Sequence, residues 1–278
     1  MPAVRELLTE GAARLAVGAI PDPRREIARL WAELSGSTPG DVVLHAEEPA
    51  DPESRARLLE AVERMLRGEP RQYIVGSTGF RRLTLACDRR ALIPRPETEG
   101  LVELALDLAS GGRALDLGTG SGCVALALAD EGHYHDVTGV DRSAEALALA
   151  RENAAACGLR VRWLQGEWCQ PVAGERFDVV VTNPPYISDP EWERLDASVR
   201  EWEPRLALTG GPDGLTELRR ILAEVPGVLA PSGWLVMEID SSRADASIAA
   251  ARHAGWTTVR VSDDLFGRPR YLVARRES

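Results

Sequence analysis

The segment Asn183-Pro184-Pro185-Tyr186 combines groups that could hold a planar nitrogen substrate. The side-chain carbonyl of Asn183 and the backbone carbonyl of Pro184 are acceptors, and the proline ring fixes the direction of the second. Two acceptors suit the two N–H bonds of an amide or exocyclic amine, a poor nucleophile, and would stabilise positive charge that develops on it. Tyr186 offers a face for packing. We expect Asn183, Pro184 and Tyr186 to be catalytic and all four residues, Pro185 included, to bind substrate.

A second candidate site is the glycine-rich segment from Asp116 to Gly122. Its spacing is GxGxG, whereas a dinucleotide site uses GxGxxG and holds a pyrophosphate at a helix N-terminus. S-adenosylmethionine has no phosphate but carries an ammonium group, for which Asp116 is an acceptor, directly or through water. A tight strand–helix turn without ligand is the alternative. The residues expected to bind this cofactor here are Asp116, Gly118, Thr119, Gly120, Ser121 and Gly122.

Three further residues extend the predicted cofactor site. Asp141 ends the next apolar run, about twenty positions further on, where a carboxylate can accept from both ribose hydroxyls. Trp168 follows the third run and is expected beside the adenine, although an ordinary core tryptophan is the alternative. Asn183 is expected to contact cofactor as well as substrate. A sulfonium is already activated, so transfer of its methyl group would depend mainly on positioning.

These residues need a sheet to bring them together. Apolar runs predict strands at 113–117, 136–140, 160–164, 178–182, 233–239, 257–261 and 270–274, and helix-compatible segments lie at 123–130, 144–157 and 215–229. Alternating strands and helices indicate a mostly parallel sheet with helices on both faces. We therefore predict an α/β, Rossmann-like domain over residues 94–278, with the motifs at the carboxyl ends of its strands.

The beginning of the chain has a different pattern. Apolar residues at helical spacing predict helices at about 4–16, 24–34 and 52–67, with a turn at 35–40. We interpret residues 1–70 as a small helical-bundle domain. Tyr73, Ile74 and Val75 are β-prone and residues 83–86 alternate, so residues 71–93 are interpreted as a linker with a β-hairpin.

Composition limits the class of protein. The 278 residues suit two domains, and the net charge of −10 is opposite to that of most proteins that bind nucleic acid through its phosphates. A solvated surface is the simple reading of the local arginine cluster, which contains Arg81, Arg82, Arg89, Arg90 and Arg95. We expect no direct nucleic-acid partner.

Other side chains point to a cytoplasmic protein without a metal. The four cysteines form no CxxC pair, which suits free thiols in a reducing compartment. His133 and His135 lack nearby cysteines, so we expect a loop there and not a metal site. The sequence has no apolar stretch of about 18 residues, and Glu6 and Glu10 do not fit a secretory signal. We expect neither a membrane span nor a leader.

At several segments the chain resembles the HemK/PrmC family, the glutamine-N5 methyltransferases of peptide chain release factors. Residues 68–76 with Phe80 look like its linker, and Leu92-Ile-Pro-Arg-Pro-Glu-Thr-Glu99 is similar to a highly specific family segment. Segments 116–122, 183–186, 203–215 and 264–268 match as well, as do Asp141 and Trp168.

The resemblance implies a specific reaction. A methyl group would pass from S-adenosylmethionine, leaving S-adenosylhomocysteine, to the glutamine of a release factor's Gly-Gly-Gln motif, with Asn183 and Pro184 binding that amide. The helical start would dock the release factor, and we expect a cytoplasmic monomer. The chain departs from the family pattern at Glu167, Asp240 and Arg243, which leaves substrate detail open.

Four alternatives remain to be weighed. A DNA adenine-N6 methyltransferase would use the same four-residue motif but needs a basic groove and a target-recognition region. A relative acting on another protein or a small molecule is the second, supported by the departures. A non-catalytic module that kept the fold is the third. An NAD-dependent dehydrogenase does not fit the glycine spacing.

Overall fold

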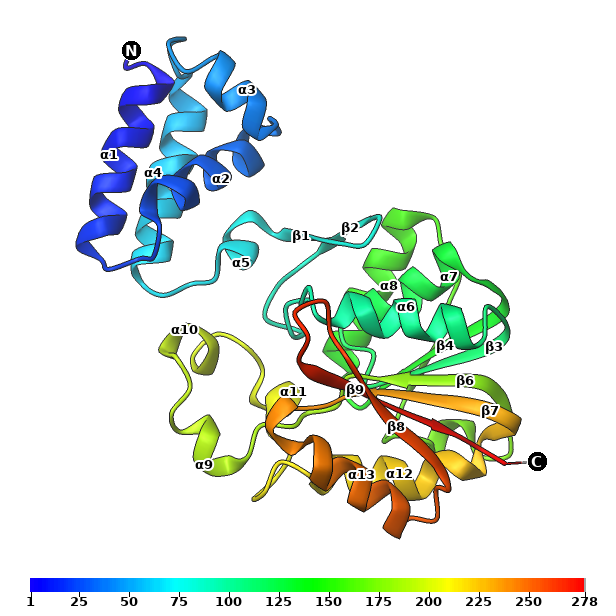
Figure 1. The fold of residues 1–278 in the computed structure, drawn as a ribbon. Helices are drawn as coiled ribbons and strands as arrows, with labels where there is room; N and C mark the ends of the chain where they lie inside the picture. Colours follow the sequence, from blue (N-terminus) through cyan, green and yellow to red (C-terminus); the bar gives the residue numbers. More distant parts are fainter. Residues whose placement is uncertain (278) are drawn as a thin grey trace. The chain divides into compact units, whose positions relative to one another are not determined.

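The computed structural model describes residues 1–277, which form two compact units (Figure 1). The first contains Met1–Gly76 together with Ala197–Trp202, and the second contains Ser77–Asp196 and the chain from Glu203 onward. The glycine-rich segment Asp116–Gly122 and the segment Asn183–Tyr186 both lie in the second unit.

The first unit is a bundle of helices. They are α1 (Val4–Val17), α2 (Pro23–Ser35), α3 (Pro39–Leu44), α4 (Pro52–Leu66), α5 (Arg71–Val75) and α10 (Ala197–Arg200). Leu15, Leu30 and Val62 are fully buried between α1, α2 and α4. Asp51 caps α4, because its Oδ1 accepts from the backbone N–H of Ser54 at 2.9 Å. The three longer helices confirm the helical pattern of the sequence.

Two local predictions in this unit are wrong. Pro39 and Gly40, expected at the end of a turn, begin α3, which starts with a capping box between Thr38 and Asp41. Tyr73–Val75, expected as β structure, lie in α5. Ile74 packs into the bundle core, and Gly76 ends the helix at φ 79°, a left-handed conformation that glycine adopts easily. Burial against the bundle therefore overrides the β-propensity of these residues.

The second unit contains a seven-stranded sheet in the order β5-β4-β3-β6-β7-β9-β8. The neighbours among the first five are parallel, and β9 pairs antiparallel with β7 and β8. The strands are β3 (Gly111–Leu117), β4 (His133–Asp141), β5 (Arg162–Gln165), β6 (Phe177–Thr182), β7 (Leu229–Glu238), β8 (Thr258–Asp263) and β9 (Pro269–Arg275). The mostly parallel, Rossmann-like sheet is confirmed.

Helices cover both faces of this sheet. One core cluster joins Ala114, Val179 and Val181 to α6 (Thr98–Leu108), α7 (Cys123–Glu131) and α8 (Ala144–Cys157). The other joins Leu115 and Val180 to α12 (Thr216–Glu224) and α13 (Ala244–His253). Successive strand residues face opposite clusters, so the central strands are buried on both sides, as their continuous apolar runs indicate.

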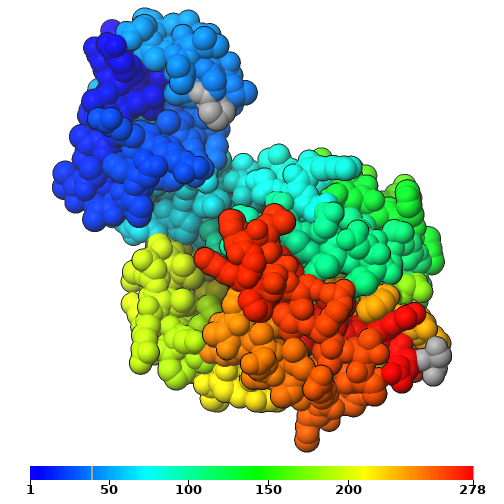
Figure 2. All heavy atoms as spheres, in the orientation of Figure 1, coloured from blue at the N-terminus to red at the C-terminus, as the bar shows by residue number. Residues whose placement is uncertain are grey.

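The remaining elements are short. A separate hairpin pairs β1 (Ser77–Phe80) with β2 (Leu83–Ala86). The turn between β8 and β9 lies on the surface, where Leu265 and Phe266 are exposed (Figure 2). The list is completed by α9 (Asp189–Trp192), α11 (Arg205–Leu208), η1 (Gln170–Val172), η2 (Val225–Gly227) and η3 (Ser241–Arg243).

Two predictions about strands need correction. His133 and His135 lie in β4 and not in a loop, because β4 continues the pairing with β3 back to Gly111. Leu229, expected at the end of a helix, begins β7. The helix ends at Glu224 because Pro226 follows in the one-turn helix η2, and proline removes a backbone donor.

Candidate active site

The sheet register brings the two motifs to one level. Leu117, the last residue of β3, pairs with Val140 on β4 and with Thr182 on β6. The next residue on each strand is therefore at the same edge: Gly118, Asp141 and Asn183. The order of the strands reverses between β3 and β6. From β3, the chain first adds β4 and β5 on one side, and it then adds β6 and β7 on the other side. Ligands of open α/β sheets bind at such a switch point.

The glycine loop is held close to the neighbouring strand. The backbone N–H groups of Gly118 and Thr119 both donate to the carbonyl of Val140 at 2.9 Å. Gly118, Gly120 and Gly122 have φ values of 70°, 56° and 83°, in the left-handed region. A Cβ on Gly122 would lie 2.9 Å from the ring of Trp163 and 3.1 Å from the Cβ of Ala150, so this position needs glycine for space as well.

Asp116 lies beneath the loop. It is 2% exposed, and its Oδ2 accepts from Thr119 Oγ1 at 2.6 Å and from the backbone N–H of Ala125 at 3.2 Å. Burial raises the pKa of this carboxyl to about 7. The carboxyl thus holds the loop to the start of α7, and a contact between Asp116 and the cofactor stays a prediction.

Asp141 fixes the other side of the loop. Its Oδ2 accepts from the N–H of Gly120 at 2.8 Å, and its Oδ1 accepts from the N–H of Ser143 at 2.9 Å. Burial raises the pKa of Asp141 above its ordinary value, while these backbone donors oppose the rise. Each carboxylate oxygen has more than one lone pair, so both can accept a further hydrogen bond from a ligand.

Trp168 is held in an uncommon backbone conformation. Its φ of 41° is left-handed, which costs a bulky residue roughly 1–2 kcal/mol. The indole Nε1 donates to Glu217 at 2.8 Å, and the six-membered ring lies 3.5 Å from the position of a Cβ built on Gly118. The neighbouring Glu167 pairs with Arg220 at 2.9 Å. The ring therefore faces the glycine loop.

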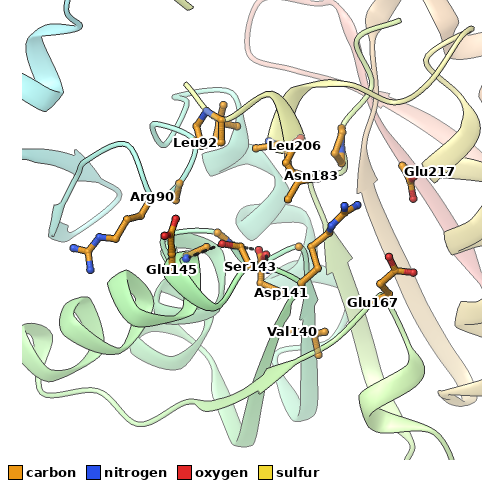
Figure 3. Close-up of a pocket in the computed structure, with 18 of the residues that line it drawn as sticks. Arg90, Leu92, Val140, Asp141, Ser143, Glu145, Glu167, Asn183, Leu206 and Glu217 are labelled. Carbon is orange, nitrogen blue, oxygen red and sulfur yellow. Dashed lines mark hydrogen bonds between the residues drawn. The ribbon is translucent and has the colours of Figure 1, made fainter. Parts of the chain in front are cut away.

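A cavity of about 370 Å³ opens between these elements (Figure 3). This volume is in the usual range for small-molecule sites. Of the predicted site residues, the structure brings six into its lining: Gly118, Gly120, Asp141, Trp168, Asn183 and Pro185. The other predicted residues are not among those that line it: Asp116, Thr119, Ser121, Gly122, Pro184 and Tyr186.

Asn183 is tied to two buried side chains. Its Nδ2 donates to Thr98 Oγ1 at 3.1 Å, and that hydroxyl donates to Glu238 Oε2 at 2.8 Å. Thr98 and Glu238 are 3% and 1% exposed. Thr182 pairs with Met237, so Asn183 and Glu238 leave adjacent strands at the same level. Burial raises the pKa of Glu238 to about 7.

Tyr186 contacts the same carboxyl group. Its hydroxyl donates to Glu238 Oε1 at 3.5 Å, and burial, then the negative charge of Glu238, raise the pKa of the phenol above its ordinary value. The backbone after Tyr186 is paired with a later loop: Ile187 N–H donates to Leu208 at 3.0 Å, and Gly210 N–H donates to Ile187 at 2.8 Å. These bonds fix the course of the chain past the motif.

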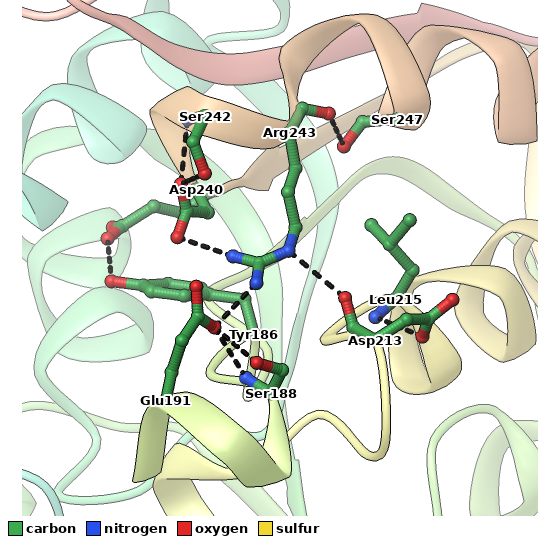
Figure 4. A network of polar contacts seen from close by, with 10 residues as sticks. Tyr186, Ser188, Glu191, Asp213, Leu215, Asp240, Ser242, Arg243 and Ser247 are labelled. Carbon is green, nitrogen blue, oxygen red and sulfur yellow. Dashed lines mark hydrogen bonds and ion pairs between the residues drawn. The ribbon is translucent and has the colours of Figure 1, made fainter. Parts of the chain in front are cut away.

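Arg243 joins three segments of the chain near Tyr186 (Figure 4). Its guanidinium donates to Asp240 Oδ2 at 2.7 Å, to Glu191 Oε2 at 2.5 Å and to the backbone carbonyl of Asp213 at 3.0 Å. Two of the three departures from the family pattern, Asp240 and Arg243, are therefore partners of one another.

The arginine cluster is largely neutralised by carboxylates. Arg81 pairs with Glu131 at 2.5 Å, Arg90 with Glu152 at 2.6 Å, and Arg95 with Glu203 at 2.5 Å. Glu203 also accepts from the N–H of Ile93 at 3.1 Å. It thereby joins two segments that line the cavity through Leu92, Pro204 and Leu206.

Sequence reasoning missed the partners of Asn183. Thr98 lies 85 positions before Asn183 and Glu238 lies 55 positions after it, so no spacing connects them. Thr98 does fall in the quoted segment 92–99, which was the available signal. Leu92, Leu206 and Glu217 in the cavity wall were missed for the same reason.

Comparison with known families matches both parts of the chain. The PrmC N-terminal domain matches residues 6–76, and the Methyltransferase small domain matches residues 98–198. A release factor glutamine methyltransferase of Deinococcus radiodurans is 38% identical over 276 residues, 98% of either chain. Proteins of the same name from Rhodospirillum rubrum and Moorella thermoacetica are each 39% identical, over 98% and 99% of this chain and 85% and 99% of their own lengths.

Solved structures share the fold. A methyltransferase from Pyrococcus furiosus superposes with a TM-score of 0.55 at 19% identity, over 82% of this chain and all of that one. The 16S rRNA N2 G1207 methyltransferase of Thermus thermophilus, solved with AdoMet and guanosine, gives 0.52 at 17% identity, over 72% of this chain and 50% of that one.

Within residues 1–277 the structure has neither a membrane-spanning helix nor a metal-binding group of side chains. No helix there has both the length and the apolar character that crossing a membrane requires. No group of three or more His, Cys, Asp or Glu side chains there is arranged to hold a metal ion.

Proposed function

The chain belongs to the release factor glutamine methyltransferase family, and we propose that it methylates the side-chain amide nitrogen of the glutamine in the Gly-Gly-Gln motif of a peptide chain release factor. The methyl donor is S-adenosylmethionine. The observation that carries the proposal is a single cavity whose lining contains both Asp141 and Asn183.

The residues present fit the cofactor. The backbone of Gly118 and Gly120 lines the cavity without side chains, which leaves space for a ligand. Asp141 would accept from the ribose hydroxyls, and Trp168 would pack beside the adenine. The bound sulfonium supplies a methyl group that is already activated for transfer.

The protein then has to orient the amide nitrogen of the substrate glutamine toward the methyl group of the cofactor. The proposal gives Asn183 Oδ1 and the carbonyl of Pro184 to the two N–H bonds, with Tyr186 and Pro185 placing the planar group. Both acceptors stabilise the positive charge that the nitrogen gains. The product loses its extra proton readily, so a strong base is not required. Asp116 would hold the glycine loop, with Thr119, Ser121 and Gly122 shaping it.

The proposal extends to the rest of the chain. The bundle of residues 1–70 would dock the release factor and residues 71–93 would link it to the catalytic domain, residues 94–278. The match of residues 6–76 to the PrmC N-terminal domain supports this division. We propose a cytoplasmic monomer without a metal or a direct nucleic-acid partner.

The test is mass spectrometry of a release factor after incubation with the chain and S-adenosylmethionine. The expected result is a gain of one methyl group on the Gly-Gly-Gln glutamine. The variant Asn183→Ala should lose about 10²–10³-fold in turnover, since a major charge-stabilising contact is removed, yet leave cofactor binding largely intact. A methylated duplex DNA with an unmodified release factor would contradict the proposal, as would near-full activity of Asn183→Ala.

A further inference from the structure

We propose that Thr98 and Glu238 are positioning residues that determine which end of the Asn183 amide faces the substrate. This inference rests on the proposed role of Asn183 in binding the substrate nitrogen. The carbonyl and NH2 groups of the Asn183 side chain have nearly the same shape, so packing alone does not determine which of them faces the substrate. Only the carbonyl can accept from an N–H of the substrate, whereas an NH2 group would oppose it.

The direction of the hydrogen bonds makes the choice. An ionised Glu238 can only accept, so the hydroxyl of Thr98, 2.8 Å away, must donate its single proton to it. The lone pairs of that hydroxyl are then left to accept from Asn183, 3.1 Å away. The NH2 end of Asn183 is thereby held at Thr98, and Oδ1 becomes the end available to a substrate.

Burial protects this arrangement from water. Thr98 and Glu238 are 3% and 1% exposed, so water does not compete for their hydrogen bonds. Three different elements supply the members of the chain: Thr98 begins α6, Asn183 follows β6, and Glu238 ends β7. Glu238 also accepts from Tyr186, so one carboxylate sets the positions of two residues of the motif.

The first experiment compares Thr98→Val with Thr98→Ser in the full-length protein. Valine keeps the shape but removes the hydroxyl, and serine keeps the hydroxyl. We expect Thr98→Val to lower kcat for release-factor methylation by about 10–100-fold, the usual effect of losing an outer positioning contact, while the Kd for S-adenosylmethionine stays within about twofold. Thr98→Ser should stay within about threefold of wild type. A folded Thr98→Val protein with wild-type kcat would overturn the inference.

A second variant guards against a simple folding defect. Glu238→Gln keeps the size of the side chain but adds a donor, so the hydroxyl of Thr98 no longer has to donate to residue 238. We expect kcat to fall about tenfold with cofactor binding unchanged. Wild-type kcat in this variant would contradict the inference, because the direction of the bonds would then be irrelevant.

A neutron structure of the wild-type protein separates this inference from the proposed function. Neutrons locate hydrogens, and so distinguish the two ends of the amide. Deuterium on the atom of Asn183 nearest Thr98 supports the inference even if release factors are not methylated. An oxygen at that position overturns it even if they are.

Discussion

The proposed cofactor end and the proposed amide end of the cavity are built differently, although both lie at the carboxyl ends of adjacent strands. At the cofactor end, backbone groups of Gly118–Gly122 are placed by left-handed glycines and by the carboxylates of Asp116 and Asp141. At the amide end, one side chain, Asn183, is placed by a chain of buried side-chain hydrogen bonds. The first design depends on space and backbone conformation, and the second on the direction of hydrogen bonds.

The largest expected effect is on stability, and it separates the cost of steric overlap from the cost of backbone strain in the glycine-rich segment. Gly122→Ala adds a Cβ at 2.9 Å from Trp163 to a residue with φ 83°. We expect a loss of about 2–5 kcal/mol in the free energy of unfolding, from left-handed strain together with overpacking. Urea unfolding measures it.

The matched control is Gly158→Ala. Gly158 has φ 68° but no atom within 4 Å of the added Cβ, so only the conformational cost of about 1–2 kcal/mol is expected. Equal losses in the two variants would show that space around Gly122 is not limiting.

The next effect concerns the cofactor alone. Asp141→Asn replaces a carboxylate oxygen by an NH2 group, which cannot accept from the N–H of Gly120 or from a hydroxyl. Because hydrogen bonds to charged groups contribute about 1.5–3 kcal/mol, the Kd for S-adenosylmethionine should rise about 10–100-fold. Calorimetry measures the Kd, and kcat at saturating cofactor should stay within about threefold.

Asp136→Asn is the control for this variant. Asp136 lies on the same strand, away from the cavity, and pairs with Arg113 at 2.8 Å. Its substitution should leave the Kd unchanged, and a similar rise in both variants would argue against a specific role for Asp141.

The amide end should respond to pH through Glu238. Burial raises the pKa of Glu238 to about 7, and a protonated Glu238 could itself donate to Thr98. The ionised form is therefore the productive one, and kcat should fall below pH 7 towards about a tenth of its maximum, the level expected for Glu238→Gln. The groups that face Glu238 are Thr98, Tyr186, Arg270, Glu97, Tyr271 and Cys123.

The measurement is kcat from pH 6 to pH 9 at saturating substrates. Glu238→Gln carries no titrating carboxyl and should remove this acid limb. An acid limb of the same position and slope in Glu238→Gln would assign the titration to another group.

The two ends of the cavity also differ in how well the sequence could predict them. The glycine spacing, Asp116 and Asp141 are local features in or directly after apolar runs, so the sequence alone singles them out, and their contact with a cofactor stays a prediction. The partners of Asn183 come from α6 and β7, and only the strand register brings them together. Likewise, the helix at Tyr73–Val75 was missed because its burial against the bundle is a tertiary effect.

The smallest expected effect concerns the loops behind Tyr186. Arg243→Gln removes bonds to Asp240 and Glu191 and loosens the segment that carries Tyr186. We expect the KM for the release factor to rise about threefold. The free energy of unfolding should fall by only about 1 kcal/mol, since these ion pairs are only partly buried. Steady-state kinetics measures the KM.

Arg219→Gln is the control for Arg243. Arg219 pairs with the side chain of Asp213 at 2.7 Å on an exposed surface, where such a pair contributes little. A similar rise in KM for both variants would place the effect in general surface charge and not in the Arg243 cluster.

The surroundings of the cysteines have a practical consequence. None of the four forms a disulfide, and burial raises the pKa of Cys87, Cys123 and Cys169 to about 12 and that of Cys157 above its ordinary value. Maleimides attack the thiolate, which is then scarce at neutral pH. Cysteines introduced at the exposed positions Val17 and Leu265 should therefore accept a pair of dyes selectively in an otherwise native background.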